Sequence, residues 1–371
     1  MNVFDVAIAG GGPAGAAAAI CLARAGRSVL LVDSGNADRA PRGESVPPAF
    51  ASLLAQLGLP SDLARDGHRA SYGNVSAWGS PKAQYTDFLV QATAPGFQLD
   101  RQAFDRSLAE AASASGVEVH LDSRMQITCG DGKEREIRIV GPRLMLRVRA
   151  RWCVDAGGRS SRLCEAFGAR RLRYDRLVAL SLMMDGGAGA DEDGRTWIES
   201  QEDGWWYSAL LPSGIRRFTF LSDADLVARS EVRETTGFLA RLGKTRHLAR
   251  LFDADRYAPL GRPRGSNAST MRLNCSAGAD WIAVGDAAQA YDPLSSQGIA
   301  NALYTGIRAA EAIHAALNGN RQGVQSYQAH LRAMFGAYLV HRHAAYSLEE
   351  RWFDNVFWQR RRDPARAIRF A

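Results

Sequence analysis

The segment Phe4–Gly15, FDVAIAGGGPAG, decides the fold. Its first half is a short apolar run typical of a buried parallel strand, and its second half has the spacing G-x-G-x-x-G. An alanine-rich stretch ending near Gly26 predicts a helix, and Ser28–Val32 predicts a second buried strand that ends at an acidic residue, Asp33. This succession of strand, glycine turn, helix, strand and acid predicts a dinucleotide-binding unit.

Each glycine of the turn has a separate task. Gly10 allows the tight turn, Gly12 lets a pyrophosphate approach the backbone, and Gly15 lets helix and strand pack closely. The phosphates are expected at the helix N-terminus, and Asp33 would accept hydrogen bonds from the adenosine ribose while repelling the 2′-phosphate of NADP. The residues predicted to bind this half of the cofactor are Gly10, Gly12, Pro13, Ala14, Gly15, Asp33 and Ser34.

Composition narrows the class of protein. A chain of 371 residues predicts two or three structural units, and 46% hydrophobic with 23% charged residues is typical of a globular protein. The net charge of +7 comes almost wholly from scattered arginines, so no nucleic-acid partner is expected. Five widely spaced cysteines without a CxxC motif favour a reducing compartment and argue against a zinc site or a disulfide framework. Val6–Ala23 is uncharged but lacks a basic leader and contains glycines, so we expect a cytoplasmic protein without a membrane span.

Two later segments favour FAD over NAD. Gly43–Ser45 stands where a simple dehydrogenase would begin another helix–strand unit. Asp280–Ala288 predicts a buried strand ending in Gly285-Asp286, and Asp292–Ile299 then leads into an alanine-rich helix. The Asp286 carboxylate can bond a ribityl hydroxyl, while the N-terminus of that helix can face the flavin pyrimidine ring.

Together these segments resemble the FAD-dependent monooxygenases of the para-hydroxybenzoate hydroxylase fold. The branch includes the flavin-dependent halogenases and the flavoproteins that mature tryptophylquinone enzymes. Gly43–Ser45, Gln98–Asp105, Asp155–Arg159 and Gly285-Asp286 occur in that family's order, and the likeness to the maturation flavoproteins is carried by Gly204–Ala209 and the ending after Glu349. The resemblance implies further FAD-binding residues: Arg42, Glu44, Ser45, Arg101, Asp155, Gly157, Gly285, Asp286, Pro293, Gly298 and Ile299.

The resemblance implies a mixed α/β fold, α+β overall. A Rossmann-like FAD-binding domain of GR2 type is expected to be discontinuous, at residues 1–70, 98–170 and 275–325. Residues 71–97 and 171–274, which contain the strand-like Thr196–Ile198 and Arg217–Leu221, would form an inserted antiparallel sheet that roofs the flavin. Residues 326–371 are expected to form a helical C-terminal segment.

The implied activity is hydroxylation of an aromatic ring through a flavin C4a-hydroperoxide, with O2 as co-substrate. The substrate would be an aromatic small molecule or a tryptophan of a partner protein, and NAD(P)H would reduce the FAD directly or through a partner flavin reductase. Trp205, Trp206 and Tyr207 are expected to line an aromatic pocket, with packing in the core as the competing interpretation. The six arginines and two aspartates after Glu350 indicate either a solvated helix face or a docking surface for a partner.

No catalytic side chain is identified from the sequence beyond one candidate, Lys82. Tryptophan halogenases carry a lysine in the sheet segment before the Leu-Asp-Arg element, and Lys82 is the lysine found there. Those halogenases also carry a glutamate where this chain has Ser295, and their Trp-x-Trp-x-Ile-Pro signature is missing. Halogenases of phenols or pyrroles, which lack that glutamate, remain an alternative. So do an FAD reductase of the geranylgeranyl-reductase type and an FAD-binding sensor without turnover.

Overall fold

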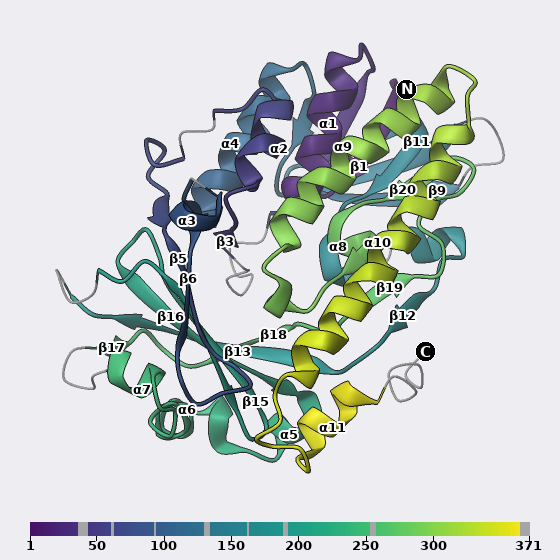
Figure 1. Ribbon diagram of the computed structural model, residues 1–371. Helices are drawn as coiled ribbons and strands as arrows, with labels where there is room; N and C mark the ends of the chain where they lie inside the picture. The colour runs from purple at the N-terminus through teal and green to yellow at the C-terminus, as the bar shows by residue number, and fades with distance from the viewer. Residues whose placement is uncertain are drawn as a thin grey trace.

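The computed structural model describes residues 1–35, 44–60, 63–92, 94–129, 134–161, 163–187, 192–252 and 257–363. Two large sheets lie at opposite ends of the molecule in Figure 1, and a long C-terminal helix runs from one toward the other. Within the described ranges, no helix combines the length and apolar composition needed to span a membrane.

The first sheet, called here the nucleotide sheet, has seven strands, and its centre is parallel. β1 pairs in parallel with β2 and β11, and these pair in parallel with β8 and β20, whereas β10 and β9 extend the sheet in antiparallel pairing. Central strands buried on both faces explain the continuous apolar runs in the sequence. The strands are β1 (Val3–Ala9), β2 (Val29–Val32), β8 (Glu118–His120), β9 (Arg124–Cys129), β10 (Arg135–Gly141), β11 (Leu144–Asp155) and β20 (Trp281–Ala283).

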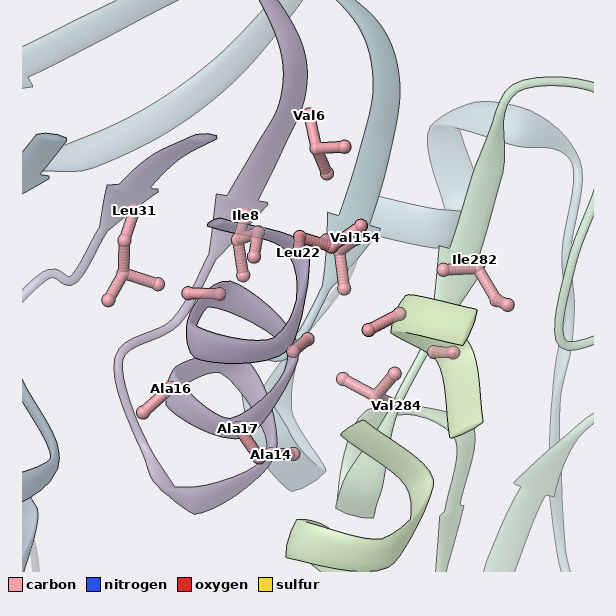
Figure 2. Close-up of a cluster of buried hydrophobic side chains, with 14 of the residues drawn as sticks. Val6, Ile8, Ala14, Ala16, Ala17, Leu22, Leu31, Val154, Ile282 and Val284 are labelled. Carbon is pink, nitrogen blue, oxygen red and sulfur yellow. The ribbon is translucent and has the colours of Figure 1, made fainter. Parts of the chain in front are cut away.

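Small side chains let helix α1 (Pro13–Arg24) pack closely between the nucleotide sheet and helix α9 (Gly298–Leu317). Figure 2 shows Ala14, Ala16 and Ala17 of α1 among apolar side chains of β1, β11 and β20. A Cβ on Gly306 of α9 would overlap the carbonyl oxygen of Ala14, so a side chain there would push the two helices apart. The helices also include α2 (Phe50–Gln56), α4 (Arg101–Ala114) and α8 (Gly285–Ala288).

The second large sheet, called here the roof sheet, has eight strands, which come from two separate segments of the chain. The strands between residues 73 and 87 join those between 177 and 267 in one sheet, in which β14 pairs with β5 in parallel rather than antiparallel orientation. The strands are β5 (Gly73–Ala77), β6 (Gln84–Asp87), β13 (Leu177–Asp185), β14 (Thr196–Gln201), β15 (Gly204–Leu210), β16 (Ile215–Asp223), β17 (Ala258–Pro259) and β18 (Arg264–Asn267).

Two small sheets lie between these layers. One is formed by β3 (Ser45–Val46), β7 (Gly96–Gln98) and β4 (Arg69–Ser71), and the other by β12 (Arg171–Arg173), β19 (Met271–Leu273) and β21 (Gln289–Ala290). The second joins strands from both predicted domains, and the domain limits in sequence remain a prediction. The shorter helices are α3 (Phe88–Ala92), α5 (Ala224–Ala228), α6 (Thr235–Leu242) and α7 (Leu248–Leu251).

The described part of the C-terminal segment is helical, as expected, and contains α10 (Gln322–Ser347) and α11 (Val356–Arg362). Helix α10 runs from beside the nucleotide sheet toward the roof sheet (Figure 1). Near its start, the Tyr327 hydroxyl donates to the carbonyl oxygen of Ala283 on β20. Near its end, the Ala345 carbonyl accepts a hydrogen bond from Trp78 Nε1, beside the roof sheet. Helix α10 therefore connects the nucleotide sheet with the roof sheet, so the position of each sheet depends on that of the other.

Candidate functional site

The glycine turn after β1 has the geometry that a dinucleotide requires. Gly10 has a φ of 111°, and a Cβ there would overlap the carbonyl oxygen of Ala156. A Cβ on Gly15 would overlap the carbonyl oxygen of Gly10, so helix and turn could not approach as they do. By contrast, no atom lies within 4 Å of a Cβ built on Gly12, and helix α1 begins there without a capping side chain. This open helix N-terminus fits a phosphate group.

Asp33 lies beside this turn at the end of β2. Its Oδ2 accepts a hydrogen bond from the Gly11 N–H at 2.6 Å, and its Oδ1 accepts one from Gly35 N–H at 2.9 Å. The side chain is half-buried, as is neighbouring Ser34. Because each carboxylate oxygen has a second lone pair, the fixed carboxylate can still accept from a ribose hydroxyl. The predicted Arg42 lies outside the described residues.

Two carboxylates, those of Asp155 and Asp286, lie where the chain turns at the ends of β11 and β20. Buried Asp155 accepts hydrogen bonds from the Gly157 and Cys164 N–H groups, both at 3.1 Å, and so fixes the turn itself. Arg159, which the sequence did not assign a role, donates to Asp286 Oδ2 at 3.1 Å and to the carbonyl oxygens of Ser269 and Tyr291. The Asp286 side chain remains 35% exposed, so its carboxylate can still reach a ribityl hydroxyl.

The loop between Asp286 and helix α9 leaves a second helix N-terminus open. Gly285 has a φ of 55° and donates to Thr305 Oγ1, which fixes the start of this loop. Pro293 is exposed, Ile299 is buried, and no atom lies within 4 Å of a Cβ built on Gly298. Helix α9 has no capping side chain. Its free N–H groups fit the carbonyl edge of a flavin ring, so the residues present are compatible with FAD.

A cluster of hydrogen bonds joins the small sheet containing β3 to the roof sheet. Ser45 Oγ lies 2.5 Å from both Gln98 Oε1 and Tyr207 OH, and Gln98 Nε2 donates to Thr196 Oγ1 at 2.9 Å. Ser45 and Tyr207 are 162 residues apart in sequence. Burial, with a smaller contribution from the charge of Glu44, raises the pKa of Tyr207, so its phenol stays protonated. A predicted cofactor residue and a predicted substrate residue are thus brought together.

Next to this cluster lies a buried ion pair that the sequence did not predict. Arg217 Nη1 lies 2.5 Å from Glu44 Oε2, and both side chains are almost fully buried. Glu44 Oε1 has no hydrogen-bond partner. Burial raises the pKa of Glu44, although the charges of Arg217 and Arg101 act in the opposite direction. Arg101 itself donates to both oxygens of Asp105, one turn along α4.

The two faces of the roof sheet differ in chemistry. Side chains opposite one another share a face, and Tyr207, Thr219 and Ser181 are aligned across β15, β16 and β13 on the face that carries Arg217. We call this the inner face, because Arg217 and Tyr207 contact Glu44 and Ser45. The outer face packs apolar side chains against α6 and α7 in one cluster: Leu180, Leu182, Met184, Trp206, Phe218, Phe220, Phe238, Leu242 and Leu248.

This arrangement corrects the prediction of a pocket lined by all three aromatic residues. Trp206 is fully buried on the outer face, against Phe220 and Phe238, and its Nε1 donates to Gln201. Trp205 is also fully buried, with its Nε1 donating to the Tyr346 hydroxyl at 3.0 Å. Both tryptophans therefore pack in the core, and Tyr207 is the aromatic residue of the three that retains exposed surface.

The remaining sequence candidates lie elsewhere. Lys82 is exposed in the turn between β5 and β6, and Ser295 Oγ donates to the Asp292 carbonyl oxygen. Two of the arginines after Glu350 form ion pairs within the chain, which does not support a docking role for them. Arg360 pairs with Asp223 and Asp225, and buried Arg361 pairs with Asp223, so both hold α11 against the roof sheet. Residues 364–371 lie outside the described ranges.

Comparison with known proteins agrees with this geometry. A family model described as an FAD binding domain matches residues 3–342. A protein of Marinomonas mediterranea named as an FAD-dependent oxidoreductase, LodB, is 30% identical over 367 residues, and the match covers 97% of each chain.

Two solved structures are similar in fold. The myxobacterial chondrochloren halogenase CndH superimposes with a TM-score of 0.88 at 23% identity, covering 98% of this chain and 86% of that one. The peptidyl tryptophan dihydroxylase QhpG, essential for tryptophylquinone cofactor biogenesis, gives a TM-score of 0.77 at 27% identity, covering 96% and 78%.

Proposed function

The chain belongs to the FAD binding domain family of flavin-dependent oxidoreductases, and from that premise we propose that it hydroxylates an aromatic ring held against the inner face of the roof sheet. One observation carries the proposal: Ser45 and Tyr207 meet at 2.5 Å, so a segment that we expect to bind FAD is in contact with the hydroxyl-bearing face of the roof sheet. The residues of this face suit an aromatic substrate. Tyr207 offers a ring for stacking, while Thr219 and Ser181, which hydrogen-bond to each other at 2.9 Å, carry hydroxyl groups on the same face.

Each part of the site has a task in the proposed reaction. Asp33 and the open turn at Gly12 would hold the adenosine half of FAD, and Asp286 with the N-terminus of α9 would hold the flavin half. The cofactor, once reduced, would supply the activation of O2. The buried pair of Glu44 and Arg217, next to the contact between Ser45 and Tyr207, would help to exclude water from the substrate. The balanced reaction takes an aromatic C–H, O2, NAD(P)H and H⁺ to a phenolic C–OH, H2O and NAD(P)⁺.

The lysines of the chain favour hydroxylation over halogenation. The sequence contains three, Lys82, Lys133 and Lys244. Lys82 and Lys244, the two in the described part, are both exposed, and Lys244 follows helix α6 on the outer face of the roof sheet. Neither offers a buried ammonium group beside the inner face. Ser295, at the position of the tryptophan-halogenase glutamate, has no carboxylate, which argues against a tryptophan halogenase but not against halogenases of phenols or pyrroles.

We further propose that the ring is a tryptophan side chain of a partner protein. The support is the likeness over 96% of the chain to a peptidyl tryptophan dihydroxylase, together with the narrower sequence likeness at Gly204–Ala209. Electrons would come from NAD(P)H directly or from a partner flavin reductase, and the experiment below distinguishes these sources.

The test supplies the FAD-loaded protein with ¹⁸O2 and either a tryptophan-containing peptide or simple phenols. NADH or NADPH is added with and without a general flavin reductase, and bromide is added in a parallel set. We expect mass spectrometry to find one ¹⁸O atom for each new hydroxyl group on the aromatic ring, independent of bromide. A brominated product would overturn the proposal in favour of a halogenase. Consumption of NAD(P)H with a hydrogenated product would favour a reductase.

A further inference from the structure

The loop that begins at Asp292 and leads to the N-terminus of α9 is anchored from behind by helix α10. Asp292 is fully buried, and its backbone N–H donates to the Tyr338 hydroxyl at 2.8 Å. Its carboxylate accepts hydrogen bonds from Leu294 N–H at 3.0 Å and from the Tyr346 hydroxyl at 2.8 Å. Two tyrosines of one helix thus hold both the backbone and the side chain of a single loop residue.

Tyr346 also connects this loop to the roof sheet. The side chain is fully buried, and the hydroxyl that donates to Asp292 accepts a hydrogen bond from Trp205 Nε1 at 3.0 Å. The guanidinium groups of Arg342 and Arg361 each lie 5.2 Å from the Tyr346 ring centroid. Since a hydroxyl has one proton to donate, its donation to Asp292 and its acceptance from Trp205 fix its orientation.

The charged groups around the Tyr346 hydroxyl indicate that this hydroxyl does more than fill space. Asp292 and Asp175 face one guanidinium group, that of Arg342, which lies 2.8 Å from Asp175 and 3.5 Å from Asp292. Asp175 is satisfied by the Leu177 and Thr270 N–H groups as well. Asp292 depends on its hydrogen bonds from Tyr346 and Leu294, because its contact with Arg342 is a charge contact without a hydrogen bond. Burial raises the pKa of Tyr346, which keeps its hydroxyl protonated as a donor.

The loop itself needs such support. Ser296 has a φ of 49°, a left-handed conformation that is costly for a residue other than glycine. Such a conformation persists where the surrounding structure fixes it. The loop between Asp292 and Gly298 contains this strained residue, and the anchor described above lies at its first position.

From these contacts we propose that Tyr346 is a positioning residue for the flavin: through Asp292 it sets where the N–H groups at the start of α9 lie relative to the ring. The inference rests on the FAD site of the proposed function, but not on the substrate or on the reaction. Removing the hydroxyl leaves Asp292 Oδ2 and Trp205 Nε1 without their hydrogen bonds, so the loop can move away from its position. Weaker hydrogen bonds to the pyrimidine edge would then favour oxidised over reduced flavin.

The experiment compares Tyr346→Phe with Tyr327→Phe, a control from the same helix. Tyr327 is equally a buried donor, but its hydroxyl bonds the Ala283 carbonyl oxygen and not the loop. We expect Tyr346→Phe to give a more negative midpoint potential of bound FAD and a several-fold larger FAD dissociation constant. Tyr327→Phe should lower the melting temperature by about as much as Tyr346→Phe does, but it should leave the midpoint potential of bound FAD unchanged. Both readouts are made without substrate, so failure of the proposed hydroxylation would not affect them.

Equal potentials in wild type and Tyr346→Phe would overturn the proposal and leave Tyr346 a structural residue. If Tyr346→Phe does not fold, Tyr338→Phe supplies the same test. Tyr338 is half-buried and accepts the Asp292 N–H, so its loss loosens the loop with less damage to the core. A potential that is unchanged in a folded Tyr338→Phe protein would overturn the proposal equally.

Discussion

Arg216 and Arg217 are neighbours on β16, yet their side chains lie on opposite faces of the roof sheet. Arg217 points to the inner face and pairs with Glu44, which directly precedes β3 of a small sheet. Arg216 is fully buried on the outer side, where it donates to Ser208 Oγ at 3.2 Å and to the Asp193 carbonyl oxygen at 2.6 Å. Arg217 therefore joins two layers of the molecule, whereas Arg216 connects a strand and a loop within one layer.

The same contrast extends over the whole sheet. The outer face is closed by α6 and α7 over an apolar cluster that includes Trp206, and we expect this face to have a structural role. The inner face carries hydroxyl groups and an ion pair at a buried position, where polar groups cost free energy unless they are paired. The proposed function would account for this polar buried face, because it would meet the cofactor and the substrate. The comparison teaches that the candidate site occupies only part of one face of this sheet, because Trp205 and Leu221 on the inner face belong to an apolar cluster with Tyr346 and Trp358.

The largest expected effect comes from Arg217→Leu, which removes the cation beside a buried carboxyl group. The free energy of unfolding should fall by about 3–5 kcal/mol near neutral pH, because Glu44 is left as an uncompensated buried charge. Urea unfolding of the variant and the wild type measures this difference.

The loss should depend on pH in a defined direction. Burial already raises the pKa of Glu44 in the wild type, and removal of Arg217 should raise it further. A carboxyl group whose pKa is raised in the folded state contributes stability at low pH that is lost as pH rises through the raised value. The deficit of Arg217→Leu should therefore be smaller at pH 5 than at pH 8. An equal deficit at both pH values would contradict the assigned contact.

On the outer face, Trp206→Phe should cost about 1–3 kcal/mol, through lost packing and the loss of the hydrogen bond from Trp206 Nε1 to Gln201 Oε1, which still accepts one from Arg241 Nε. FAD affinity and turnover at a temperature where the variant is folded should equal those of the wild type. Thermal unfolding and a flavin-binding titration measure the two effects. A loss of turnover without a loss of stability would mean that the outer face takes part in the reaction.

On the inner face, Tyr207→Phe should reverse this pattern. The stability change should stay near 1 kcal/mol, the usual net worth of one hydrogen bond, here that to Ser45. The kcat/KM for the aromatic substrate should fall about tenfold, equivalent to about 1.4 kcal/mol of transition-state stabilisation. Steady-state kinetics on both variants, Trp206→Phe and Tyr207→Phe, compares the faces directly. Unchanged kinetics in Tyr207→Phe would remove the inner face from the substrate site.

The smallest effect is expected for Lys82→Ala, since this side chain is exposed in a turn. Melting temperature, turnover and the identity of the product should all remain those of the wild type. If Lys82→Ala abolished a halide-dependent activity and left the halide-independent turnover unchanged, the halogenase interpretation would be restored.

Local spacing predicted the nucleotide half of the site. The roles of Gly10, Gly12 and Gly15 depend on neighbours within a few residues, and the structure gives each the expected surroundings at the turn. The strands at Thr196–Ile198 and Arg217–Leu221 were also predicted from their composition, and β14 and β16 confirm them. The binding roles of the individual residues stay predictions.

Contacts between distant residues could not be predicted. Glu44 and Arg217 are 173 residues apart, and their pairing follows from the packing of two layers. In β16 the alternation of Arg217 and Thr219 with Phe218 and Phe220 does distinguish two faces. In β15 the run Trp205–Tyr207 conceals the alternation, because three aromatic residues in succession look alike.

The measurement that tests the central claim most directly is rapid-mixing absorbance of the chemically reduced, FAD-loaded protein with oxygen. It is run with a tryptophan peptide, with and without bromide. The account predicts a transient absorbance before oxidised FAD returns, whose decay follows the peptide concentration, ignores bromide and yields hydroxylated peptide. Direct return to oxidised FAD in the presence of peptide, or a decay that bromide accelerates, would contradict it.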